Sequence, residues 1–274
     1  MEGNTNQDLM DLRAMFLTLL DFDLENQSNF DHPFCLTYKV LLKLSPETNE
    51  YKYLLFNCLF GVIEYMHMLK NTNISEYEKW KIRLVKNKKS VGLYGDIYEL
   101  YIHWSLERKK ISFLKSERPD FKVDWKGSNV FIECGSAQFD FDKTPNDKEV
   151  FRKLKSVIRS NFTSGYLNHS TALFIDITNL IFHLSNFDAG VLSRALKDVD
   201  IELKRNPSNT LKEPGIITFM NFELIRNSTG QDYACNIAGS FLNPNVDSNL
   251  KSFLEENFVR GVEKPIVINP KFHH

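Results

Sequence analysis

Residues 119–135 read PDFKVDWKGSNVFIECG, and this stretch decides the fold. Residues 121–125 and 129–134 have strand character, and Gly127 between them can take the positive φ that a tight hairpin turn requires. A hairpin about this turn places the start of the first strand beside the end of the second. Asp120 and Glu133 are therefore expected at the same end of the sheet.

Glu133 follows three apolar residues, and a carboxylate in such surroundings is costly to bury unless it is paired or bound to a metal. Together with Asp120 and a backbone carbonyl, it would form a hard-oxygen site suited to Mg²⁺ or Mn²⁺. Such an ion can activate water and stabilise the charge that develops on a phosphodiester. Taken singly, each residue has an ordinary reading, Asp120 as a turn residue after proline and Glu133 as a solvated strand end.

The elements on either side of this stretch predict an α/β protein. A long helix over 93–109 and a strand over 111–115 precede it. The elements expected after it are a helix over 147–160, a strand over 172–177, a helix over 189–204, a strand over 215–222, strand character over 233–241 and a helix over 248–259. The segment ALFIDI, from residue 172, is almost purely apolar, as is typical of a strand inside a mixed sheet.

The first 90 residues are predicted to be a separate helical region. Helices are expected over 8–20, 51–69 and 76–85, the last with Trp80 and Ile82 pointing inward. The charged break KNKKS at 86–90 ends this region, so the expected domains are residues 1–90 and 91–274. The helical region carries no chemical motif.

The composition excludes several classes of protein. The 274 residues include 34 basic and 35 acidic side chains, and the net charge of −1 argues against coating nucleic acid by bulk electrostatics, although a local basic groove remains open. The four cysteines lack metal-ligand spacing. There is no secretion signal, and the apolar stretch 54–69 is too short and too interrupted to span a bilayer. A cytoplasmic protein without a membrane partner is expected.

A helix with Glu99, then Pro119-Asp120, then Glu133-Cys134-Gly135, then a helix and a strand resembles the PD-(D/E)xK nuclease superfamily. The similarity covers roughly residues 91–180. The resemblance implies a restriction-endonuclease-like mixed sheet flanked by helices, and a Mg²⁺- or Mn²⁺-dependent endonuclease that hydrolyses phosphodiester bonds. It implies DNA rather than RNA as substrate, since most of the superfamily acts on DNA, and a setting such as restriction or antiviral defence against phage.

The resemblance also assigns roles in metal binding. Glu99, Asp120 and Glu133 would hold the ion, with the backbone carbonyls of Ile132 and Cys134 as further ligands.

The chain departs from the family at the lysine that orients or activates the attacking water. That position, two residues after the second acid, is Gly135. Some members supply the lysine from the following helix, which makes Lys153 and Lys155 the candidates here and Arg159 a weaker substitute. As exposed helix residues, both lysines also have an ordinary reading.

Basic residues near these elements are candidates for contacts with nucleic acid phosphates. They are Lys109, Lys110, Arg118, Arg152 and Arg159. Their default reading is solvated surface. A homodimer, or a protein partner in a defence complex, is compatible with the resemblance.

Two other functions stay open. Gly135 favours a catalytically inactive subunit of the same fold that binds nucleic acid or a protein partner. In the third reading the protein is a helical adaptor, residues 1–90 are its working surface, and the acidic positions are incidental.

Overall fold

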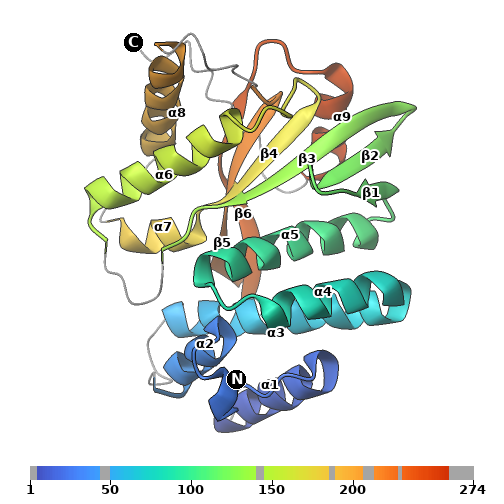
Figure 1. Cartoon of the computed structure of the whole chain (residues 1–274), viewed down its shortest axis with the longest axis vertical. Coiled ribbons are helices and arrows are strands. Elements are labelled where there is room, and N and C mark those ends of the chain that lie inside the picture. The colour runs from blue at the N-terminus through green and yellow to red at the C-terminus, as the bar shows by residue number, and fades with distance from the viewer. Residues whose placement is uncertain are drawn as a thin grey trace. The chain divides into compact units, whose positions relative to one another are not determined.

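The computed structural model describes residues 5–43, 50–139, 145–184, 189–205, 213–227 and 230–258. The described strands form a six-stranded sheet of order β1-β2-β3-β4-β5-β6 (Figure 1). The predicted α/β class is confirmed. The chain forms two compact units, residues 1–104 with 222–234, and residues 105–221 with 235–274. The expected boundary at residue 90 stays a prediction.

The first unit is built from helices. They are α1 (Thr5–Leu20), a short 3-10 turn η1 (Gln27–Asn29), α2 (Pro33–Lys43), α3 (Glu50–Thr72), α4 (Ile74–Lys86) and most of α5 (Ser90–Arg108). On α4 the buried residues are Tyr77, Trp80 and Leu84, one apolar stripe at helical spacing. The prediction that Ile82 points inward is wrong, since it is 51% exposed. Two residues correspond to about 200° of helical turn, so Ile82 and the buried Trp80 lie on opposite sides.

The sheet combines an antiparallel meander with parallel strands. The strands are β1 (Phe113–Lys115), β2 (Phe121–Trp125), β3 (Ser128–Ser136), β4 (Thr171–Asp176), β5 (Ile216–Asn227) and β6 (Gly230–Leu242). β2 pairs antiparallel with both β1 and β3. β4 runs parallel to β3, and β5 runs parallel to β4. Lys126 and Gly127 form the β2–β3 turn with φ of 51° and 78°, as a two-residue hairpin turn requires.

One face of the sheet packs on α9 (Ser248–Asn257). Trp125 of β2 lies 5.3 Å from Phe253 between ring centroids, and Phe174 of β4 lies 5.3 Å from Phe258. Phe174 is paired in register with Cys134 of β3, so Cys134 shares this face.

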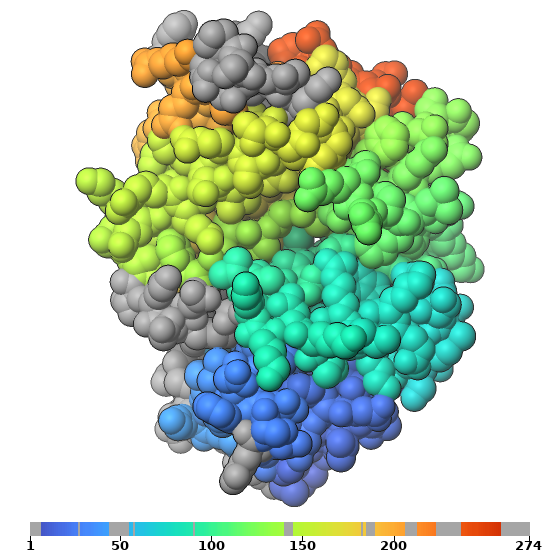
Figure 2. Space-filling model, viewed as in Figure 1, coloured from blue at the N-terminus to red at the C-terminus, as the bar shows by residue number. Residues whose placement is uncertain are grey.

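The opposite face packs on α6 (Asp147–Phe162) and α8 (Ala189–Lys204), with the short α7 (Thr178–His183) beside them. Leu173 and Ile175 of β4 meet the buried stripe of α6, which comprises Val150, Leu154, Ile158 and Phe162. Asn146 and Glu149 form a capping box that starts α6. The outer side of α6 lies at the molecular surface (Figure 2), where Arg152 and Arg159 are exposed.

Within the ranges that the structure describes, no helix is both long and apolar enough to cross a membrane.

Candidate functional site

The β2–β3 hairpin brings Asp120 and Glu133 together. Phe121 pairs with Ile132, so Asp120 stands opposite Glu133 at the end of the ladder. The backbone N–H of Asp120 donates to Glu133 Oε2 over 3.2 Å, and the N–H of Cys134 donates to Asp120 Oδ2 over 2.7 Å. The expected adjacency of the two acids is therefore confirmed.

Glu133 lies on the sheet face that packs against α6. It pairs in register with Leu173, which belongs to the core beneath that helix, and only 8% of Glu133 is exposed. Tyr166, in the segment between α6 and β4, donates its O–H to Glu133 Oε1. Burial and then this hydrogen bond raise the pKa of the Tyr166 phenol well above its usual range. The phenol therefore stays protonated and keeps donating to the carboxylate.

The two neighbouring carboxylates offer hard oxygen atoms, which divalent cations such as Mg²⁺ prefer as ligands. Across the described ranges no group of three or more His, Cys, Asp or Glu side chains is placed to hold a metal. Mg²⁺, however, commonly binds through one or two protein carboxylates and keeps waters or substrate phosphate oxygens in its other positions. Asp120 and Glu133 meet that requirement, and the carbonyls of Ile132 and Cys134 lie on the same strand as Glu133. The donor set fits Mg²⁺ or Mn²⁺.

Glu99, the third acid in the expected metal site, has a cation partner in the first unit. It lies on α5 and is 5% exposed. Arg83 of α4 donates to both of its oxygens, over 3.0 Å to Oε1. The same guanidinium binds Asp96 Oδ1 over 2.7 Å. The role of Glu99 in metal binding stays a prediction, and the structure adds a structural role for it.

Asn161 of α6 is the side chain next to the position of the missing lysine. Gly135 lies two residues after Glu133 and so faces the same side of β3. A Cβ at Gly135 would stand 3.4 Å from Asn161 Nδ2, an ordinary van der Waals contact. The pattern of acids and lysines did not point to Asn161.

The two lysines of α6 lie elsewhere on the helix. Lys155 Nζ bonds to Glu202 Oε1 over 2.6 Å and to Asp198 Oδ2 over 3.5 Å, both on α8. Lys153 Nζ lies 5.9 Å from the ring centroid of Phe139, beyond the end of β3. Along the helix, Lys153 is eight residues from Asn161, or about 12 Å at 1.5 Å per residue. Their assistance to the attacking water stays a prediction.

Of the predicted phosphate-binding residues, Arg118 lies next to the acidic pair. Its guanidinium carbon is 5.7 Å from the centroid of the Tyr166 ring, and the side chain is exposed. Lys109 and Lys110 are exposed after α5. Arg152 and Arg159 lie on the exposed side of α6, where Arg159 pairs with Glu202.

Sequence reasoning missed a second buried acid at the end of β4. Asp176 is 4% exposed, and its oxygens accept hydrogen bonds from Gln138 Nε2 over 2.9 Å and from the backbone N–H of Thr178 over 2.9 Å. Burial raises the pKa of Asp176 to about 6. Glu133 was predicted to be costly to bury because it follows three apolar residues, and Asp176 follows a similar apolar run in ALFID.

Comparison of the chain with protein-family models, with curated proteins and with solved structures gives no match.

Proposed function

We propose that the protein is a Mg²⁺- or Mn²⁺-dependent endonuclease that hydrolyses phosphodiester bonds, in DNA rather than RNA. The observation that carries this proposal is the pair Asp120 and Glu133, two adjacent carboxylates at one end of a hairpin. The proposed setting is restriction or defence against phage, in the cytoplasm, acting as a homodimer or with a protein partner.

The order of the elements supports the proposal. A helix, a three-stranded antiparallel meander, a helix and a strand parallel to the third follow one another from α5 to β4. This is the order that the resemblance to the PD-(D/E)xK superfamily implies, and the two acids fall at the positions that carry the motif.

Each residue near the pair has a defined part in the proposed reaction. Asp120 and Glu133 would hold the divalent ion, which when bound would supply an activated water and neutralise charge on the phosphate. Tyr166 fixes the orientation of Glu133 through Oε1. Arg118, exposed beside Tyr166, would bind a phosphate of the substrate as it approaches the pair.

The proposal is tested by cleavage of single-stranded DNA, duplex DNA and single-stranded RNA with Mn²⁺ present. The native protein is compared with Glu133→Gln, and Asp124→Asn is the matched control, since Asp124 is an exposed acid on β2. We expect the native protein and the control to cleave DNA and Glu133→Gln to lose cleavage. Equal cleavage by native protein and Glu133→Gln would contradict the proposal.

A second candidate is an inactive subunit of the same fold that binds nucleic acid or a protein partner. The observation that favours it is Gly135, whose neighbour is the uncharged Asn161. In that case native protein binds DNA without cleaving any of the three substrates, and Arg118→Ala weakens the binding.

A further inference from the structure

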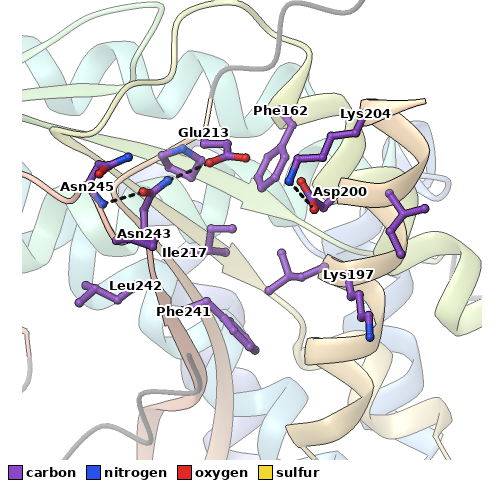
Figure 3. A pocket seen from close by; sticks show the side chains of 14 residues that line it. Phe162, Lys197, Asp200, Lys204, Glu213, Ile217, Phe241, Leu242, Asn243 and Asn245 are labelled. Atoms are coloured by element: carbon purple, nitrogen blue, oxygen red, sulfur yellow. Dashed lines mark hydrogen bonds and ion pairs between the residues drawn. The ribbon is translucent and has the colours of Figure 1, made fainter. Parts of the chain in front are cut away.

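A pocket of about 480 Å³ lies in the second unit, apart from the acidic pair (Figure 3). It is lined by α8, by the start of β5 and by the residues where β6 ends. The acidic pair belongs to β2 and β3, and β4 separates these strands from β5 in the sheet. The two sites share no residue, so the pocket needs an explanation of its own.

The floor of the pocket is apolar and includes flat rings. Phe162 at the end of α6 and Phe241 of β6 line it, together with Ile217 of β5. All three are buried in the core that α6 and α8 cover. Pro214 and Pro244 add further apolar surface to the lining. The two phenylalanine rings favour a planar apolar body, because such a body can stack on an aromatic ring.

The rim carries charges of both signs, and three of them, on Asp200, Lys204 and Glu213, have partners within the protein. On α8, Lys204 Nζ donates to Asp200 Oδ2 over 2.8 Å. Across the pocket, Asn243 Nδ2 donates to Glu213 Oε2 over 3.0 Å, and the backbone N–H of Asn245 donates to Asn243 Oδ1 over 2.9 Å. Figure 3 shows these two polar groups on opposite walls, with Ile217 and Phe241 between them.

The charges of the rim also limit the charge of the ligand. Two lysines, Lys197 and Lys204, stand against two carboxylates, Asp200 and Glu213, so the lining has no net charge. A ligand with a full charge of either sign would gain attraction from one pair of groups and repulsion from the other. A molecule without net charge that both donates and accepts hydrogen bonds suits this rim better.

We propose that the pocket binds a nucleobase, a planar and uncharged heterocycle whose edge carries hydrogen-bond donors and acceptors side by side. The ring would lie on the apolar floor, and its edge would donate to Glu213 and accept from the neighbouring Asn243 amide. The pocket volume of about 480 Å³ lies within the roughly 300–1,000 Å³ that is typical of pockets for small molecules, a class of ligand that includes nucleosides.

The ligand class is tested by titrating the full chain with adenosine, guanosine, cytidine and uridine, followed by calorimetry. Benzoate and tryptophan are the comparison probes, a planar anion and a planar zwitterion. We expect at least one nucleoside to bind with Kd below about 1 mM and at least tenfold more tightly than either comparison probe. If none of the four nucleosides binds, or if benzoate or tryptophan binds as tightly, the proposal is wrong.

The place of binding is tested with Ile201→Trp, which enlarges a side chain of the lining. Ile201 is 37% exposed, so the larger ring can be accommodated without repacking the core. Ile82→Trp on α4 is the matched control, since Ile82 is 51% exposed and lies in the other unit. We expect Ile201→Trp to weaken nucleoside binding at least tenfold at an unchanged Tm, and the control to bind normally. If Ile201→Trp binds the nucleoside as tightly as native protein does, the binding site lies elsewhere.

A polar substitution tests the proposed hydrogen bond. Glu213→Gln keeps an oxygen that can accept from Asn243 but removes the charge that favours a donor on the ligand. We expect about a fivefold loss of nucleoside affinity. Unchanged affinity in this variant would overturn the proposed orientation of the base.

Discussion

Arg83 is the residue on which two buried carboxylates of the first unit depend. Asp96 and Glu99 have side chains only 9% and 7% exposed, and both bind its guanidinium. Desolvation raises the pKa of Asp96 from its usual value, although Asn87 and Arg83 oppose this effect. Removing one partner of a buried ion pair leaves an uncompensated charge, which is costly.

We therefore expect Arg83→Ala to lower the free energy of unfolding by about 3 kcal/mol, the lower end for a buried pair, because Arg83 itself is 41% exposed. Lys79→Ala on the same helix is the control, since the Lys79 side chain in its pair with Glu76 is 68% exposed, and it should cost less than about 1 kcal/mol. Denaturant melts of both variants measure the difference. Similar small losses would show that Glu99 does not rely on Arg83.

Asp176 should make the stability of the protein depend on pH. Its folded pKa of about 6 lies above the ordinary value of 3.8, so the folded state holds the proton more tightly than the unfolded state. The stability that Asp176 contributes is therefore full below about pH 4 and is lost as the pH rises through about 6. Two pH units correspond to about 3 kcal/mol.

The measurement is the free energy of unfolding of native protein minus that of Asp176→Asn, between pH 4 and pH 8. We expect this difference to fall by about 2 kcal/mol across the range, because the amide does not titrate and the unfolded carboxyl is already partly ionised at pH 4. A constant difference would mean that Asp176 is ionised throughout.

At the scale of elements, the sequence predicted those features that depend on residues close together along the chain. The β2–β3 hairpin followed from Gly127, and its register placed Asp120 opposite Glu133 because the turn is short. The long helices and ALFIDI followed from periodicity and apolar runs. Tyr166 could not be predicted, since it reaches Glu133 from a segment 33 residues away that carries no motif. Asp176 could have been predicted as a buried acid, since it follows an apolar run in β4.

The position of the missing lysine, residue 135, lies on β3, and a substitution can introduce a lysine there. Gly135 faces the same side as Glu133, and a Cβ at this position makes only ordinary contact with Asn161. We expect Gly135→Lys to raise Mn²⁺-dependent cleavage of DNA at least tenfold, since a positioned proton-transfer group typically contributes more than that. Gly135→Met, of similar length and without charge, is the control. Equal rates in the two variants would mean that position 135 has no catalytic role.

At the scale of the whole molecule, the proposed chemistry rests on the second unit. Asp120, Glu133, Tyr166 and Gly135 all lie within residues 105–221, whereas Glu99 belongs to the first unit with its partner Arg83. The sequence indicated the pair because both acids lie on one hairpin. It could not indicate the ion pair of Glu99, because helical spacing does not reveal which residue of a neighbouring helix stands opposite.

The most direct test of the metal site is the shift in Tm that Mn²⁺ produces in native protein, Glu133→Gln and Asp124→Asn. A ligand at 100 times its Kd stabilises the folded state by about 2.7 kcal/mol. For a chain of this size we expect a rise of about 5 °C or more in the native protein and in Asp124→Asn. Glu133→Gln should lose most of that rise, with a Tm in the absence of metal that is unchanged or higher, because adjacent carboxylates repel each other. If Mn²⁺ raises the Tm of Glu133→Gln as much as that of native protein, and the Tm of this variant without metal is lower than the native Tm, a metal site at Asp120 and Glu133 is contradicted.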